Sequence, residues 1–247
     1  MIKLGTGTLT LNGAGSLTNS TTVSAGTLVV NNTWTGTNVT VSSSATLSGG
    51  GTINAAIQIG SGGTLAPGIA APTILNVTSN LLFAAGGTAH MYINAGTVTC
   101  DRVAGMPALT YGGTLTVTNL GGTFALGQSY QLFSAVNYSG SFSATNLPVL
   151  SGLAWNWNPA SGTLSVISGV ATNPTNLTAT VSSGSLKLSW PADHTGWRLL
   201  VQTNHLLTGI SSNTNDWGTV AGSAATNQVS LPIDSTKPTE FYRLAYP

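Results

Sequence analysis

The residues able to do acid–base or metal chemistry are few, so each can be tested in turn. The 247-residue chain has five acidic and six basic side chains, and Asp101 is the one carboxylate before Lys187. A glycosidase generally needs two carboxylates facing one bond, and a calcium site needs a cluster of acidic oxygen ligands. Arg102 follows Asp101 directly, so a strand would point the two side chains to opposite faces. The chain up to Leu186 therefore lacks the groups for either chemistry, and we expect Asp101 to be structural.

Nucleophilic and metal-dependent chemistry are equally unsupported. Asp193 and His194 could supply two members of a hydrolase triad, but the chain has no Gly-x-Ser-x-Gly segment to provide the serine. His90 and His205 lie far from His194 in the chain, and Cys100 is the single cysteine, which also excludes an internal disulfide. We therefore expect no catalytic residue, no metal and no cofactor, and we expect Cys100 to be a buried small residue.

One aromatic pair is a candidate binding feature. Trp155 and Trp157 are separated by one residue, so a strand would place both indole rings on one face, where they could stack against a sugar. The same spacing suits a hydrophobic cap at the end of a stack of strands, and we favour the cap. Two further tryptophans, Trp190 and Trp197, are expected in a core.

The composition indicates an all-β chain with a nearly uncharged surface. Charged residues make up 4% of the sequence, against about 25% in an ordinary soluble domain. Thr, Val, Leu and Ile together suit pleated strands with one wet face. The net charge of +1 includes no basic run, so we expect no nucleic-acid partner. Apolar stretches such as residues 81–85 are far shorter than the roughly 20 residues of a membrane helix, so we expect no membrane span.

The elements that would position these residues are marked by an internal repeat. The phrase Gly/Ala-Thr-Leu occurs at residues 7–9, 26–28, 45–47 and 63–65, so its threonine recurs at a nearly constant spacing. A period of about 20 residues is typical of one coil of a β-solenoid, in which each coil covers its neighbour's apolar face. Alternation along a strand sends the leucines to one side and the threonines to the other. We predict an interior ladder of Leu9, Leu28, Leu47 and Leu65 and an exterior ladder of Thr8, Thr27, Thr46 and Thr64.

These repeats resemble a known bacterial family. Residues 7–13 and 21–30, continued by 39–41, 50–53 and 62–68, resemble the autotransporter-associated β-strand repeat of passenger proteins. The similarity implies a right-handed parallel β-helix in a secreted or cell-surface protein of a Gram-negative-type bacterium. Because the first residues lack the apolar segment of a signal peptide, we expect a mature form or a fragment of a longer exported protein.

The last third of the chain reads as a separate module. Residues 168–174 are small and polar and end in a proline, and eight of the eleven charged residues follow Leu186. We predict a β-solenoid over 1–168, with longer coils or a closing sheet after residue 66, and a small antiparallel β-sandwich over 174–247. Residues 186–191 resemble the second strand of a fibronectin type III-like domain. The whole module is similar to C-terminal modules of exported proteins from Verrucomicrobia-like bacteria, which implies a sorting or attachment role.

Three functions fit these observations. The leading hypothesis is a non-catalytic structural or adhesive surface protein that forms homo-oligomers or fibres through its solenoid ends and terminal module, because strand edges are unpaired there and little charge opposes pairing. The second is a module that binds surface polysaccharide through Trp155 and Trp157. The third is a non-catalytic fragment of a polysaccharide-processing enzyme.

Overall fold

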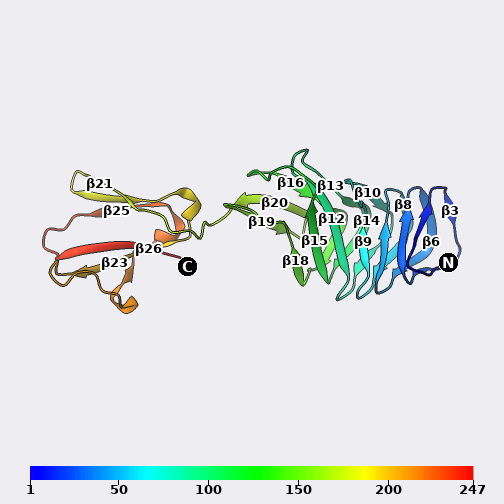
Figure 1. Cartoon of the computed structure of the whole chain (residues 1–247), viewed down its shortest axis with the longest axis horizontal. Coiled ribbons are helices and arrows are strands. Elements are labelled where there is room, and N and C mark those ends of the chain that lie inside the picture. The colour runs from blue at the N-terminus through cyan, green and yellow to red at the C-terminus, as the bar shows by residue number, and fades with distance from the viewer. Residues whose placement is uncertain (247) are drawn as a thin grey trace. The chain divides into compact units, whose positions relative to one another are not determined.

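The computed structural model describes residues 1–246, which form short β-strands joined by turns. The helices within that range are three short 3₁₀ helices, η1 (Ala192–His194), η2 (Thr214–Asp216) and η3 (Ser223–Ala225). The chain divides into two compact units, one of Met1–Leu150 with Trp155–Ile167 and the other of Ser151–Ala154 with the residues from Ser168 onward. Figure 1 shows the first unit as a stack of coils and the second as a pair of small sheets.

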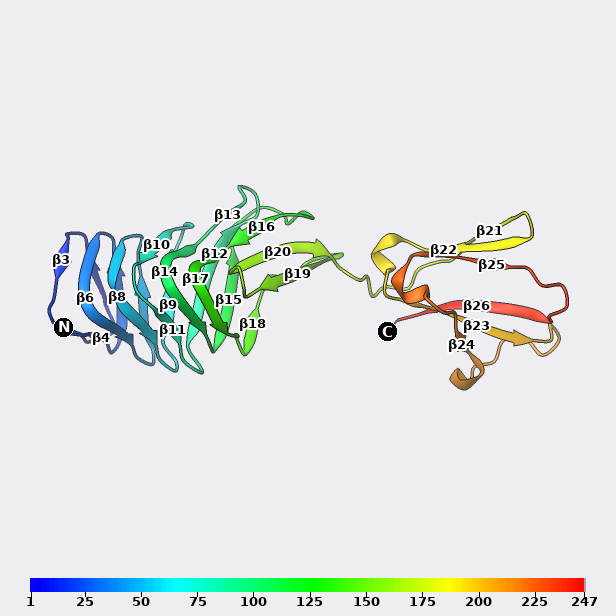
Figure 2. The ribbon, with the colours of Figure 1, turned by 180° about the vertical axis from the view of Figure 1, so that it is seen from behind.

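Two long sheets form the walls of the first unit. The nine-stranded sheet contains β1 (Ile2–Lys3), β3 (Gly15–Ser16), β4 (Thr21–Val23), β6 (Thr33–Val41), β8 (Thr52–Ile59), β10 (Ile74–Val77), β11 (Leu81–Phe83), β14 (Arg102–Tyr111) and β17 (Phe133–Gly140). The eight-stranded sheet contains β2 (Thr8–Leu11), β5 (Gly26–Val30), β7 (Ala45–Ser48), β9 (Thr64–Ala66), β12 (Thr88–Asn94), β13 (Thr99–Cys100), β15 (Thr114–Asn119) and β18 (Ala144–Asn146). Strands of one coil pair in parallel with those of the next, as β6 does with β8 (Figure 2). In the other sheet β5 pairs in parallel with β7. The first unit is therefore a parallel β-helix, which confirms the fold predicted from the repeat.

Alternating burial along these strands builds the core between the two sheets. In the nine-stranded sheet Val23, Val41, Ile59 and Phe83 lie in register on successive coils, and all four are buried. Removing an aliphatic side chain of this size from water stabilises the fold by about 1.5–3 kcal/mol. Because each side chain is covered by those of the coils above and below, the core is continuous along the stack.

A lysine begins this interior column at the first coil. Lys3 on β1 pairs with Val23, so its side chain occupies the position that later coils fill with apolar residues. Its ammonium donates hydrogen bonds of 2.9, 2.9 and 3.0 Å to the carbonyl oxygens of Leu4, Gly5 and Ala25. All three protons of the charged group are thereby matched to acceptors, which explains how a lysine can be buried there without a carboxylate.

Glycines at two corners set how closely the coils stack. Gly26 and Gly49 adopt φ values of +67° and +116°, which L-residues with a side chain rarely adopt. A Cβ atom on Gly49 would lie 2.1 Å from the carbonyl oxygen of Val30, and one on Gly26 would lie 2.4 Å from that of Gly7. The coil spacing at these corners therefore depends on the missing side chain as well as on the backbone angle.

A third sheet lies at the C-terminal end of the stack. It contains β16 (Ser129–Gln131), β20 (Thr163–Ser168) and β19 (Leu153–Asn158) in that spatial order. The pairing of β16 with β20 is antiparallel, in contrast to the coils before it. The parallel stacking of coils therefore gives way to a hairpin-like sheet at this end.

The second unit is built from two three-stranded antiparallel sheets. One contains β21 (Thr178–Ser182), β22 (Ser185–Ser189) and β25 (Gln228–Pro232), and the other contains β24 (Gly218–Thr219), β23 (Arg198–Asn204) and β26 (Thr239–Ala245) (Figure 2). Leu188 and Trp190 from the first sheet and its end pack with Leu199 from the second in one buried cluster. The two sheets therefore face each other across a shared core, as in a small β-sandwich.

Candidate functional site

The outer face of the eight-stranded sheet carries a regular row of threonines. Parallel pairing places Thr8 opposite Thr27, Thr27 opposite Thr46, and Thr46 opposite Thr64. The row continues to Thr88 and then to Thr114 on the longer coils. From Thr27 onward the residue that follows each threonine is buried, so the face presents hydroxyl and methyl groups to solvent and the alternate side chains to the core.

The leucine ladder has the same register, but its first member is not buried. Leu28, Leu47 and Leu65 are at most 1% exposed, whereas Leu9 is 37% exposed. The prediction that Leu9 lies in the interior is therefore wrong. The physical reason is that β2 is the end strand of its sheet, so a coil covers Leu9 on one side only. Beyond Leu65 the ladder passes to Ala89 and Leu115, both buried.

Polar side chains bridge neighbouring coils on the outer surface. The Asn31 amide donates to the Asn12 side-chain oxygen at 3.0 Å, and the Asn54 amide donates to the Thr35 hydroxyl at 3.1 Å. The Thr78 hydroxyl donates to the Asn54 side-chain oxygen at 2.9 Å. Neutral hydrogen bonds thus link the coils where many proteins use charged pairs.

The two candidate tryptophans pack against other aromatic rings at the C-terminal end of the solenoid. The Trp157 ring lies 5.7 Å from Tyr111, 6.2 Å from Phe133 and 5.9 Å from Phe142. These centroid distances are those of attractive aromatic pairs. Both tryptophans are half-buried.

Trp155 contacts a second group of rings beside the first. It lies 4.9 Å from Phe124 and 6.3 Å from Tyr130, and its indole N–H donates to the Pro148 carbonyl oxygen at 2.8 Å. The inner edges of both indoles are therefore engaged within the protein. Any stacking partner would be limited to the part of each ring that remains exposed.

Asp101 is fully buried and holds three segments together. Its carboxylate accepts hydrogen bonds from the backbone N–H groups of Thr73 at 2.7 Å and Tyr92 at 2.9 Å. Burial raises the pKa of the Asp101 carboxyl, while the hydrogen bonds from Tyr92, Thr73 and Gly68 act in the opposite direction. Both carboxylate oxygens are thus occupied by backbone donors, as is usual for a buried polar group.

Cys100, next to Asp101, is half-buried rather than buried as expected. Burial raises its thiol pKa to about 11, with the neighbouring Asp101 charge adding to the effect. A thiol with such a pKa carries little thiolate at neutral pH, so Cys100 is a poor nucleophile.

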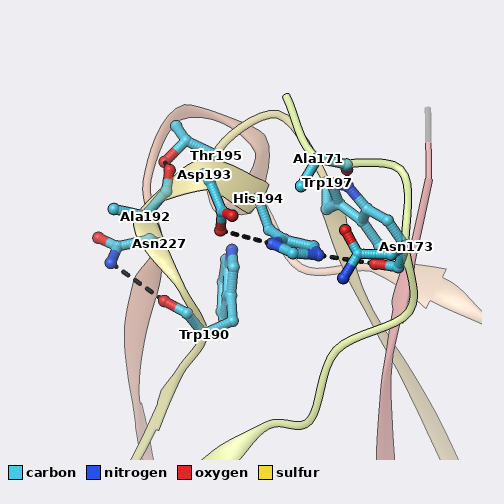
Figure 3. Close-up of polar contacts among 9 residues, drawn as sticks. All are labelled: Ala171, Asn173, Trp190, Ala192, Asp193, His194, Thr195, Trp197 and Asn227. Carbon is cyan, nitrogen blue, oxygen red and sulfur yellow. Dashed lines mark hydrogen bonds and ion pairs between the residues drawn. The ribbon is translucent and has the colours of Figure 1, made fainter. Parts of the chain in front are cut away.

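The Asp193–His194 pair lies in the second unit, and its geometry differs from that of a triad. The Nδ1 atom of His194 lies 2.7 Å from Asp193 Oδ1, and its Nε2 atom lies 2.7 Å from the backbone carbonyl oxygen of Asn173 (Figure 3). In a triad the second ring nitrogen must accept a proton from a nucleophile. Here that nitrogen faces a carbonyl oxygen, which has no proton to give.

The part of the chain that the structure describes holds no group of three His, Cys, Asp or Glu side chains able to bind a metal ion. It also has no helix long and apolar enough to cross a membrane.

A groove of about 370 Å³ opens at the first coil, where Met1, Leu11, Leu17 and Trp34 contribute to its lining.

Comparison with known proteins finds a similarity for the N-terminal residues of the chain. Residues 1–30 match the model of a family described as the passenger-associated-transport-repeat. No curated protein matches the chain. The match does not extend to the C-terminal module, so its fibronectin-like and Verrucomicrobia-like resemblances stay predictions. The N-terminal segment is thus similar to a repeat of autotransporter passenger proteins, whose family implies secretion or surface exposure in Gram-negative bacteria.

Proposed function

We propose that this protein is an extracellular structural or adhesive component that works through contact surfaces and not through catalysis. The observation that carries the proposal is the solenoid itself, a regular parallel stack whose eight-stranded sheet contains no Asp, Glu, Lys or Arg in its strands and whose one carboxylate is buried and occupied by backbone donors. A surface of this kind is suited to extended contact, because it has little net charge to repel a second neutral surface.

The two ends of the solenoid differ in the surface that they present for contact with another chain. Packed aromatic rings and an antiparallel sheet lie at the C-terminal end. At the N-terminal end β1 and β2 are the last strands of their sheets, and Ile2 and Leu4 are 67% and 70% exposed. A strand edge with exposed apolar side chains is a template for pairing with another chain. We expect copies of this chain to associate through such edges, and the edge at β1 is the one that can be tested by substitution.

The test is the size of the purified protein as a function of concentration. We expect oligomers or filaments in sedimentation and electron micrographs, and we expect Ile2→Glu combined with Leu4→Glu to abolish them. Gln58→Glu is the control, because Gln58 is exposed in the middle of the stack and the substitution places a new negative charge away from the end. A chain that stays monomeric at high concentration, or an assembly unaffected by the double substitution, would rule out this mode of association.

For the C-terminal module we propose that it is a fibronectin type III-like domain that attaches the protein to the bacterial surface. The two small antiparallel sheets around one core support it, as does an apolar loop after β23 in which Leu206, Leu207 and Ile210 are all largely exposed. The loop is held in shape by the Asn204 amide, which donates to the Gly209 carbonyl oxygen at 3.1 Å. Replacing Leu206 and Leu207 with Ser is expected to weaken binding to the bacterial surface without changing the melting temperature, and unchanged surface binding would contradict the proposal.

Polysaccharide binding is the second candidate, favoured by the part of the Trp155 and Trp157 rings that remains exposed. A glycan array tests it directly with the whole chain. Binding that survives replacement of Asn156 by Ala but is lost when either tryptophan becomes Phe would support this function. Absence of binding to every glycan by the intact protein would remove it.

A further inference from the structure

A short segment leading into β21 is tied to η1 and to the residue before β23 by three hydrogen bonds. We call this segment, Ala171–Asn173, the strap. The Ala171 N–H donates to the Asp193 carbonyl oxygen at 2.6 Å, and the Trp197 indole N–H donates to the Ala171 carbonyl oxygen at 2.7 Å. The third bond joins His194 Nε2 to the Asn173 carbonyl oxygen at 2.7 Å (Figure 3). Two of the three bonds are therefore made by side chains, and one of those is ionisable.

The partners of His194 decide its protonation state. A backbone carbonyl oxygen can only accept, so Nε2 must donate to Asn173. The carboxylate of Asp193 also accepts, so Nδ1 must donate at 2.7 Å. Only the imidazolium form has both donors. In neutral histidine the stronger bond, to the carboxylate of Asp193, keeps the remaining proton on Nδ1, so Nε2 would face the lone pair of the Asn173 carbonyl oxygen at hydrogen-bond distance. Since the residue is 2% exposed, water has little access to replace the lost bond.

The surroundings of the ring contain one charged partner. Asp193 lies on η1 beside it and is half-exposed. The strap contributes Ala171, Thr172 and Asn173, none of which is ionisable. The Trp197 ring packs 5.1 Å from the imidazole and is in turn contacted by Tyr246, whose phenol is the other titratable group on this side. The charge of His194 is thus balanced by Asp193 alone.

We propose that His194 is a proton-operated latch, which holds the strap against η1 when it is protonated and releases the Asn173 end when it loses its proton. Release would free the residues between Asn173 and β21 from this attachment. The strap would then be held by the two bonds at Ala171 alone, so the bond from the Ala171 N–H to Asp193 would open more often than in the closed state.

The direction of the pH dependence follows from the same contacts. The hydrogen bond to the Asn173 carbonyl is the largest influence and raises the pKa of His194; burial lowers it by less, and the hydrogen bond and charge of Asp193 raise it further. A raised pKa in the closed state means that the closed strap is fully favoured below the ordinary histidine pKa of about 6.5. That advantage is lost as the pH rises through the higher value of the closed state. The latch therefore closes in acid and opens in base.

The experiment uses the full chain and follows two signals from pH 5 to pH 9. NMR of the imidazole nitrogens gives the titration of His194, and amide hydrogen exchange, corrected for its intrinsic pH dependence, gives the protection of Ala171. We expect the pKa of His194 to exceed about 6.5. Between about pH 6.5 and the pKa of His194, the protection of the Ala171 amide should fall about tenfold per pH unit, and above that pKa it should level off.

Three variants separate the latch from other causes. His205→Gln is the matched control, because His205 is exposed in the loop after β23, and it is expected to leave the pH dependence unchanged. His194→Gln is expected to remove it. If that variant fails to fold, Asp193→Asn keeps an acceptor but removes the charge, and is expected to move the midpoint to lower pH. A His194 pKa below 6.5, or Ala171 protection that is constant while His194 titrates, would overturn the proposal.

Discussion

The solenoid and the C-terminal module achieve stability by different means. In the solenoid a few positions recur coil after coil, and side-chain hydrogen bonds between coils on the outer surface join neutral groups. The module holds eight of the eleven charged residues, and its contacts are individual pairs such as Arg243 over the Trp217 ring at 4.2 Å. The effect of a substitution on stability should therefore depend, in the solenoid, on the coil in which it lies. In the module it should depend on the single residue that the replaced side chain contacts. The solenoid should therefore be sensitive to shape and the module to charge.

The largest effect should come from the corner glycines of the solenoid. Gly49→Ala is expected to destabilise the unit by more than about 4 kcal/mol, because it combines an unfavourable φ with a Cβ 2.1 Å from a carbonyl oxygen. Gly5→Ala is the control, since Gly5 has φ of +73° but no atom within 4 Å, and it should cost about 1 kcal/mol. Denaturant unfolding measures both, and equal losses would mean that the close approach of coils is unimportant.

The next effect tests position along the ladder. Leu47→Ala is expected to lower the free energy of unfolding by about 3 kcal/mol, because the side chain is fully buried between two coils. Leu9→Ala makes the same chemical change on the first coil and should cost less than about 1 kcal/mol, since that side chain is already partly in water. Similar values for the two variants in denaturant titrations would show that Leu9 is covered in solution.

A third test compares how the stability of the solenoid and that of the module change with pH. Because burial raises the pKa of Asp101, the solenoid should gain stability as the pH falls from that raised value toward the ordinary value near 4. Hydrogen bonds from Thr236 lower the pKa of Asp234 in the module, so stability present above about pH 4 should be lost as the pH falls through the lowered value. Hydrogen exchange of peptides from β7 and β25 between pH 5 and pH 3 resolves the two responses.

Two substitutions assign these responses to their carboxyl groups. Asp101→Asn should abolish the response of the solenoid and cost about 1–3 kcal/mol, since an amide cannot accept both backbone bonds. Asp234→Asn should abolish the pH response of the module and leave the pH response of the solenoid unchanged. Parallel loss of protection in both units on acidification would contradict the opposite signs.

The smallest effects concern single pairs in the module. Arg243→Gln removes the cation from the Trp217 ring and is expected to destabilise the module by about 1 kcal/mol. Lys237→Gln breaks an exposed ion pair to Glu240 at 3.3 Å and should cost less than about 0.5 kcal/mol. Thermal unfolding at low and at high salt checks both, and a larger salt effect on the solenoid than on the module would reverse the comparison.

The fold of the solenoid could be predicted because its information is local and repeated. The threonine and leucine that mark a coil at residues 64 and 65 have counterparts in register at Thr88 and at Thr114, although the coils that lead to them are longer. These longer coils add loops while the paired residues stay in register. A period read from the sequence therefore survives insertions between its marked positions.

The site residues were harder to predict because their partners are not marked in the sequence. The alternation of Trp155 and Trp157 fixes their common face, but the rings they meet come from separate coils, including Tyr111 and Phe133. The bond from His194 goes to the backbone carbonyl of Asn173, which has no side-chain signature. The exposure of Leu9 depends on what lies beside the first coil, and periodicity carries no information about that.

The register of the threonine and leucine rows has a consequence for how such a chain can change over time. Each coil offers the next the same pair of residues at the same height, so removal or duplication of one whole coil would leave a matching surface on both sides of the junction. An in-frame duplication of about one period is thus far less disruptive than the loss of a few residues within a coil, which would move leucines to the outer face. The length of the solenoid can drift in whole coils while its cross-section is conserved.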